Sequence, residues 1–202
     1  MKPLLCLTLV TLLFTSQAAF ADEPAATQPT TRTIEEKIAR TGVSAGIDAG
    51  YGIRLWDHGT SIDMPVGAVH VAFPLTRPVG SSWYRGVLDY RLEIQGGVVT
   101  NMDDNAFVGL SPIGLRYNFT AAGKLVPYLE GLLGGAYIDV PNHIQGSKFN
   151  FTQMAGVGTQ YFMTPDIALN MQARFMHLSN AGLKEPNHGI NEGFLLVGIS
   201  FY

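Results

Sequence analysis

A histidine and a serine stand two residues apart near the end of the 202-residue chain, in the stretch HLSNAGLKEPNHGIN from His177 to Asn191. A serine hydroxyl attacks an ester only when a neighbouring base accepts its proton, and histidine suits that task near neutral pH. Side chains at positions i and i+2 of one strand lie about 7 Å apart on one face, so a modest bend brings them within hydrogen-bond reach. His177 and Ser179 are therefore candidates for nucleophilic ester chemistry.

The residues after the serine have turn chemistry. Asn180, Ala181 and Gly182 can reverse the chain and aim backbone N–H groups at a developing oxyanion. An H-x-S pair alone is weak evidence, because most such pairs belong to ordinary hairpins. Whether this stretch is an enzyme loop or a simple hairpin turn depends on the elements that position it.

The first residues of the chain predict export. Lys2 is followed by an apolar run from Leu4 to Thr15 and by the small-x-small motif Ala19-Phe20-Ala21, which predicts a secretory signal peptide at 1–21. Removing it leaves no cysteine, so a large core or a membrane must stabilise the mature protein without disulfides. Residues 22–41 are polar and rich in Pro and Thr, with one or two helical turns at most, and predict a flexible leader.

The composition favours a membrane protein without helical spans. Charged residues make up 14% of the chain, against about a quarter in typical proteins, and there are 23 glycines. The mature chain has 12 basic and 16 acidic residues, a net charge of −4 that gives no indication of nucleic-acid binding. No later stretch approaches 18 apolar residues, which excludes transmembrane helices and leaves a β-barrel as the way to cross a membrane.

From residue 42 onward the hydrophobic pattern has a period of two. The clearest case is residues 88–95, where Leu, Tyr, Leu and Ile alternate with Asp, Arg, Glu and Gln. Comparable segments predict eight strands, at 45–55, 68–75, 88–95, 107–119, 125–138, 149–161, 167–177 and 193–202. We therefore predict an all-β fold, an eight-stranded antiparallel transmembrane β-barrel over residues 42–202 in the bacterial outer membrane.

The connections and the chain end support this topology. The short turns TAAGK and TPD alternate with longer connections at 57–66, 98–106, 140–148 and 180–192, as short periplasmic turns and long outer loops do. The chain ends in the alternating strand LLVGISFY with a terminal aromatic residue. A soluble, lipocalin-like barrel is the alternative, in which the apolar side chains would face inward.

The same alternation places the histidine–serine pair on the lipid-facing side. In the predicted strand 167–177, Asn170, Gln172 and Arg174 share the lumen face, and the odd positions through His177 and Ser179 share the lipid face. Polar side chains there are costly unless the reacting molecule is itself in the membrane.

The segment RFMHLSNAGLKEPNHGIN, residues 174–191, resembles the signature segment of the lipid A 3-O-deacylase family (PagL type), also called acyloxyacyl hydrolases. The resemblance implies an eight-stranded outer-membrane barrel that removes an ester-linked acyl chain from lipid A of lipopolysaccharide. It implies Ser179 as nucleophile and His177 as general base. Asn180, Gly182 and Asn187 are then candidates for the oxyanion hole.

One position departs from the family. Characterised members carry a glutamate that orients the histidine, where this sequence has Asn191, and Glu192 is the next residue. Position 191 shares the lipid-facing parity of Leu195 and Val197, whereas position 192 does not, so Asn191 is expected to be the third member unless a bulge intervenes. In a serine triad, replacing Asp by Asn costs about 10⁴ in rate through the wrong tautomer.

Other residues indicate no cofactor and no metal. His58, His70, His143 and His188 lack metal-ligand spacing. We expect an interior salt-bridged network, leaving little room for a channel, that contains Asp48, Arg54, Arg85, Asp89, Arg91, Glu93, Glu130 and Arg174. The alternatives to an esterase are a non-catalytic structural or adhesive barrel of the same fold and a small-solute channel. Lipid A, the outer membrane and a second copy in a homodimer are the partners considered, and nucleic acid is not.

Overall fold

The structure is a computed structural model that describes residues 33–54, 63–100, 105–141 and 143–202. The predicted signal peptide at 1–21 and residues 22–32 of the predicted leader lie outside this part of the chain. Its elements are α1 (Ile34–Arg40), β1 (Ser44–Arg54), β2 (Met64–Pro74), η1 (Ser82–Tyr84), β3 (Gly86–Val99), β4 (Asn105–Phe119), η2 (Thr120–Ala122), β5 (Leu125–Ile138), β6 (Phe149–Thr164), β7 (Ile167–Ser179) and β8 (Ile190–Phe201). No helix in the described residues is long and apolar enough to cross a membrane.

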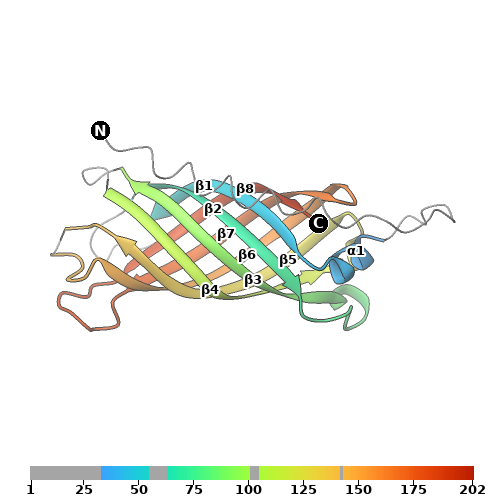
Figure 1. Cartoon of the computed structure of the whole chain (residues 1–202), viewed down its shortest axis with the longest axis horizontal. Coiled ribbons are helices and arrows are strands. Elements are labelled where there is room, and N and C mark those ends of the chain that lie inside the picture. The colour runs from blue at the N-terminus through green and yellow to red at the C-terminus, as the bar shows by residue number, and fades with distance from the viewer. Residues whose placement is uncertain (1–32, 55–62, 101–104, 142) are drawn as a thin grey trace, which may run out of the picture. The chain divides into compact units, whose positions relative to one another are not determined.

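The eight strands form one closed antiparallel barrel in chain order, with β1 paired to both β2 and β8 (Figure 1). Closure gives every strand two neighbours and removes the exposed edge that an open sheet would present. The predicted fold class and all eight predicted strands are confirmed, and every strand except β1 and β5 is longer than the alternating segment that predicted it.

The outer wall of the barrel is apolar and the interior is polar. On β8, Leu195 and Val197 are 61% and 60% exposed, whereas Arg91 and Glu93 on β3 are fully buried. Apolar surface turned outward and charge turned inward is the arrangement of a barrel that sits in lipid. It is the reverse of a lipocalin, so the soluble alternative is wrong.

Arginines and carboxylates bridge the lumen. Arg91 donates to Asp48 Oδ2 at 3.1 Å and to Glu93 Oε2 at 2.6 Å. Arg174 donates to Glu93 Oε2 at 3.0 Å and to Glu130 Oε1 at 2.8 Å. An interior cavity of about 10 Å³ beside Arg174 has room for about one water molecule. Side chains fill the lumen, which removes support from the channel alternative.

The network differs from its prediction at several residues. Asp89 faces the lumen, but its side chain accepts from the Asn118 amide at 2.6 Å, and no ion pair joins it to an arginine within the described residues. Arg116 belongs to the network, donating to Glu130 Oε2 at 2.8 Å, and was not predicted. A register shift between Leu110 and Ile113 changes which parity of β4 faces inward, so the alternation before it does not apply after it. Arg85 does not belong to it, because it lies in the β2–β3 connection with its side chain 46% exposed. The Arg54 side chain lies outside the description.

One connection at the short-turn end is longer than expected. The turns between β4 and β5 and between β6 and β7 are short, but the β2–β3 connection runs over residues 75–85 and contains η1. Its Trp83 ring stacks on Phe119 with centroids 6.5 Å apart, and Tyr84 packs edge-on against Trp83 at 5.7 Å. Aromatic rings of this kind gather at the membrane–water boundary of outer-membrane barrels.

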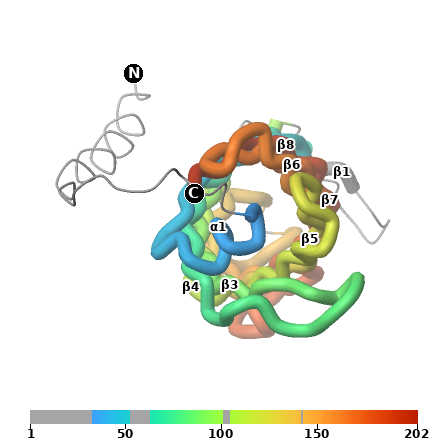
Figure 2. Tube along the Cα trace, turned by 90° about the vertical axis from the view of Figure 1, so that its right-hand side faces the viewer, coloured from blue at the N-terminus to red at the C-terminus, as the bar shows by residue number. Residues whose placement is uncertain are grey.

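The helix α1 lies across the opening at this end of the barrel (Figure 2). It starts at the N-cap Thr33, whose side chain accepts from the Glu36 N–H, and it buries Ile38 in a cluster with Val87, Val126, Phe162 and Ala168. The one or two helical turns expected near the end of residues 22–41 are α1, which packs against the barrel. A seven-residue helix is marginal by itself, and packing of its apolar face supplies the missing stability.

Polar contacts tie α1 to all three connections at this end. Glu35 accepts from Arg85 of the β2–β3 connection at 2.8 Å and from the Thr120 hydroxyl of η2 at 2.6 Å. Lys37 pairs with Asp166 of the β6–β7 turn at 2.5 Å. The guanidinium of Arg85 is the main cause that lowers the pKa of the Glu35 carboxyl below its usual value.

Candidate active site

Strand β7 presents His177 and Ser179 on the outer wall, at its end beside the β7–β8 loop. Both side chains are half-buried, and their neighbours Met176 and Leu178 are buried in the lumen. The backbone register places His177 directly between Gln153 of β6 and Asn191 of β8. The predicted lipid-side parity of the pair is confirmed.

Asn191 holds the imidazole of His177. Its Oδ1 lies 2.8 Å from His177 Nδ1. An amide oxygen only accepts hydrogen bonds, so Nδ1 carries the proton in this arrangement and Nε2 keeps its lone pair. That is the tautomer in which Nε2 can take a proton from a serine hydroxyl.

Glu192 points the other way. It is 1% exposed, faces the lumen, and pairs in register with Met176 on one side and Arg54 on the other. No bulge interrupts the β7–β8 register between Ile167 and Leu178, so the parity argument holds for this segment. Asn191, and not Glu192, stands beside His177.

Gly189 packs against the edge of the same imidazole. A Cβ atom at this position would lie 3.0 Å from His177 Cε1, tighter than nearly all real contacts, and the backbone φ of +71° is one that glycine adopts without strain. The ring is therefore confined by Asn191 at Nδ1 and by the Gly189 backbone at Cε1. Sequence reasoning missed Gly189, although a glycine before a strand is a recognisable signal for positive φ.

The β7–β8 loop that follows Ser179 is held by Asn180. Its backbone N–H donates to Asn187 Oδ1 at 3.0 Å, and its side chain donates to the Lys184 carbonyl at 2.6 Å. Asn180 was predicted as an oxyanion contributor, and the structure uses its N–H and its side-chain amide inside the loop. Ala181 and Gly182 follow with φ of +56° and +74°, which turns the chain sharply above the site.

Two of the predicted oxyanion donors keep open hydrogen-bonding groups. Within the described residues no hydrogen bond occupies the Gly182 N–H or the Asn187 side-chain NH₂. Because Asn187 Oδ1 is fixed by Asn180, the orientation of that NH₂ group is fixed as well. No hydrogen bond joins the Ser179 hydroxyl to His177 in this part of the chain, and catalytic hydrogen bonds often tighten only around substrate.

Apolar and small side chains surround the pair on the outer wall. Phe151 lies opposite Ser179 in the register and packs edge-on against Phe149 with centroids 5.5 Å apart, and both rings are largely exposed. Towards the middle of the membrane-facing wall, Ala155 and Ala173 leave a low surface between larger side chains.

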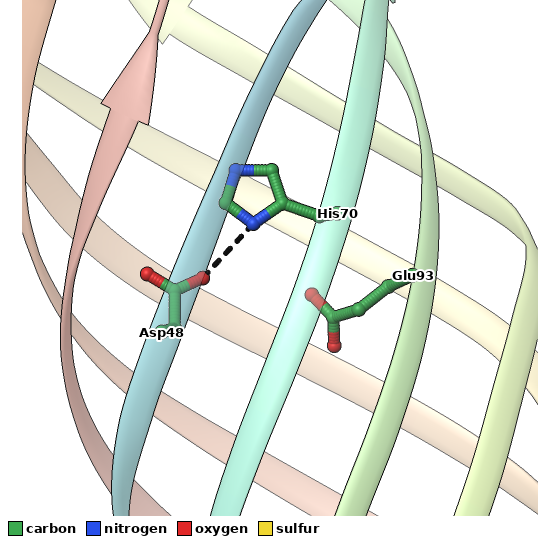
Figure 3. Close-up of side chains that lie close together, drawn as sticks. All are labelled: Asp48, His70 and Glu93. Atoms are coloured by element: carbon green, nitrogen blue, oxygen red, sulfur yellow. Dashed lines mark ion pairs between the residues drawn. The ribbon is translucent and has the colours of Figure 1, made fainter. Parts of the chain in front are cut away.

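A second cluster of side chains lies inside the barrel and is separate from this pair. Asp48, His70 and Glu93 bring potential metal ligands within 4.8 Å of one another, and His70 Nδ1 is 3.1 Å from Asp48 Oδ2 (Figure 3). Sequence spacing could not find it, because the three residues come from three different strands. Arg91 and Arg174 already bond these carboxylates, so the cluster belongs to the charge-balanced lumen network.

The fold and the outward-facing residues define the class of the protein: an outer-membrane β-barrel with a histidine, a serine and an asparagine together on its lipid-facing wall. The family model of lipid A 3-O-deacylase (PagL) matches residues 67–200. The chain belongs to this family. No curated protein matches it significantly in sequence.

Solved structures share the barrel fold. The outer membrane enzyme PagL superposes with a TM-score of 0.55 and 19% identity, over 77% of this chain and 97% of that chain. Neisserial surface protein A (NspA) superposes with a TM-score of 0.58 and 16% identity, over 80% of this chain and 97% of that chain. At these identities the similarity concerns the fold alone, and the two differently named neighbours share that fold.

Proposed function

We propose that this protein is an esterase of the outer membrane that removes an ester-linked acyl chain from lipid A, after export directed by residues 1–21. The observation that carries the proposal is the 2.8 Å contact between His177 Nδ1 and Asn191 Oδ1, two positions from Ser179 on the lipid-facing wall. An oriented imidazole beside a serine is the minimal apparatus for acyl transfer. Its place on the wall suits a substrate that resides in the leaflet.

The proposed reaction has two halves. His177 Nε2 accepts the Ser179 proton while Oγ bonds to the ester carbonyl carbon. The tetrahedral intermediate collapses, the bond from that carbon to the sugar oxygen breaks, and the departing oxygen takes the proton from Nε2. Water then attacks the acyl-serine with His177 again as base, which releases the fatty acid and restores Ser179. No cofactor or metal is required by these steps.

The β7–β8 loop supplies the proposed oxyanion donors. Gly182 N–H and the Asn187 side-chain NH₂ are the candidates, because both lie in the loop directly after Ser179 and neither is engaged within the described residues. Removing one such donor from a serine hydrolase costs about 10²–10³ in kcat. Asn180 supports this arrangement by fixing Asn187.

Mass spectrometry of lipid A tests the proposal. Lipid A from cells that produce the protein should lack one acyl chain compared with lipid A from cells that do not. Ser179→Ala should restore the full mass while the barrel keeps its heat-modifiable migration, and Ser147→Ala in the neighbouring β5–β6 loop is the matched control that keeps deacylation. Deacylation by a folded Ser179→Ala protein would remove Ser179 from the mechanism.

One observation favours a second candidate, a non-catalytic structural or adhesive barrel. The position that orients His177 holds a neutral amide, which cannot supply the compensating charge of a carboxylate. Such a barrel would leave lipid A unchanged, and a fluorophosphonate ester would not label Ser179 selectively. Labelling that is lost in Ser179→Ala would exclude this candidate.

A further inference from the structure

The β5–β6 and β7–β8 loops form a second, miniature pairing beyond the barrel. Gln145 and Asn187 form an antiparallel bridge, and the Gly146 N–H donates to the Pro186 carbonyl at 2.7 Å. The His188 N–H lies 3.5 Å from the Ile144 carbonyl on the other side of that bridge. Three backbone contacts in consecutive residues fix one loop against the other around Asn187.

This contact is too close to admit any residue but glycine at position 146. A Cβ atom on Gly146 would fall far inside van der Waals distance of the Glu185 carbonyl oxygen and 3.1 Å from the Lys184 carbonyl oxygen. Restoring an ordinary contact requires the Glu185 backbone to retreat by roughly 1 Å. The obstacle is backbone, which cannot rotate away as a side chain can.

The β5–β6 loop is itself anchored in the barrel. Ile144 is 4% exposed and belongs to the same apolar cluster as Leu178 near the end of β7 and Ile190 at the start of β8, which flank the β7–β8 loop on the lumen side. Gln145 and Gly146 are buried as well. A loop anchored in this way can hold its neighbour at a fixed position.

We propose that Ile144–Gly146 acts as a positioning clasp for the oxyanion donors of the β7–β8 loop, with Gly146 as its key positioning residue. The inference rests on the proposed function. The clasp grips the residues on both sides of Asn187, whose NH₂ group is a proposed donor. The contact between His177 Nδ1 and Asn191 Oδ1 joins β7 to β8 and lies outside the clasp, so the clasp acts on the oxyanion side of the site.

Steady-state kinetics on purified, detergent-solubilised protein with lipid A test the clasp. Gly146→Ala should lower kcat by about 10²-fold, since a misplacement of 1 Å has an effect of that order, and should leave KM within about twofold. The acid limb of the kcat–pH profile should stay where it is, because Asn191, which holds His177 Nδ1, lies on β8 outside the clasp. Gly67→Ala is the matched control and should keep full activity. Gly67 faces outward on β2, and a Cβ atom placed there would lie 3.9 Å from its nearest neighbour, the Asp48 carbonyl oxygen.

Ile144→Ala weakens the anchor without adding bulk and should lower kcat by about 10-fold, so it decides the matter if Gly146→Ala fails to fold. A spin-label pair at positions 147 and 184 gives a structural readout, and its distance distribution should broaden in either variant. Wild-type kcat in a folded Gly146→Ala protein would overturn the inference, as would an unchanged label distance. An inactive wild type would instead overturn the proposed function, and with it the catalytic part of the inference.

Discussion

Replacing Asn191 by an acid tests the role of the orienting residue most directly. Asn191→Asp is isosteric and keeps an oxygen 2.8 Å from His177 Nδ1, while Asn191→Glu restores the residue type that the family resemblance implies. We expect both to raise kcat, because a carboxylate compensates the imidazolium that forms while Ser179 attacks.

The magnitude follows from what the structure already provides. Asn191 Oδ1 holds the productive tautomer, so the change adds charge only, and the gain stays well below the 10⁴ lost when the tautomer is wrong. Two unit charges about 4 Å apart interact by about 4 kcal/mol at an effective dielectric constant of 20. This value is an upper bound on the gain. Solvent screens the two charges at this half-buried site, and the carboxylate replaces a neutral hydrogen bond that already stabilises the imidazole. We expect the substitution to lower the activation barrier by about 1.4–2.7 kcal/mol, which raises kcat by about 10- to 100-fold.

The assay is release of fatty acid from purified lipid A, quantified by mass spectrometry at several pH values. Glu192→Gln is the paired control, since Glu192 faces the lumen, and it should change kcat by less than about twofold in protein that migrates as a folded barrel. If Glu192→Gln abolishes deacylation and neither Asn191 variant raises it, the orienting role assigned to Asn191 is refuted.

Two further predictions concern the stability of the barrel. Arg174→Ala removes a guanidinium that bonds Glu93 and Glu130 in the lumen. It should lower the free energy of unfolding in detergent, measured by denaturant titration, by about 3–5 kcal/mol. A loss under about 1 kcal/mol would contradict the stabilising role of the network. The lowered pKa of Glu35 means that its pairing with Arg85 stabilises the fold above the unfolded-state pKa near 4.5 and that this contribution disappears as pH falls through the lower folded-state value. Unfolding followed between pH 6 and 3 should therefore show a steeper loss of stability in the wild type than in Glu35→Gln, and parallel curves would refute the assignment.

The fold was predictable because apolar and polar side chains alternate regularly along a strand that has one face in lipid and the other in the lumen. That logic located eight strands and placed His177, Ser179 and Asn191 on one face. It failed where the alternation itself is interrupted. The register shift before Arg116 exchanges the faces of β4. Pro112 lies inside this shift, and a proline within a strand is a local signal for a bulge, but the alternation alone did not use it.

The remaining differences come from contacts between distant segments. Docking of α1 depends on Arg85 and Asp166, which lie about 50 and 130 residues away along the chain. Gly146 meets Glu185 across about 40 residues, and its neighbours alone give no reason for a glycine there. A single sequence specifies such contacts only through the assembled barrel, so periodicity and turn chemistry could not predict them.

The position of Ser179 on the outer wall makes the proposed enzymology two-dimensional. Substrate would arrive by lateral diffusion within the leaflet, so the quantity that sets the rate is the surface density of lipid A and not its bulk concentration. The freed fatty acid is released into the same leaflet, beside Phe151 and the alanines of β6 and β7, where it competes with the next substrate molecule. Adding inert lipid to the same membranes should slow turnover per protein molecule, because it lowers the surface density of lipid A while the total concentrations of protein and lipid A stay unchanged.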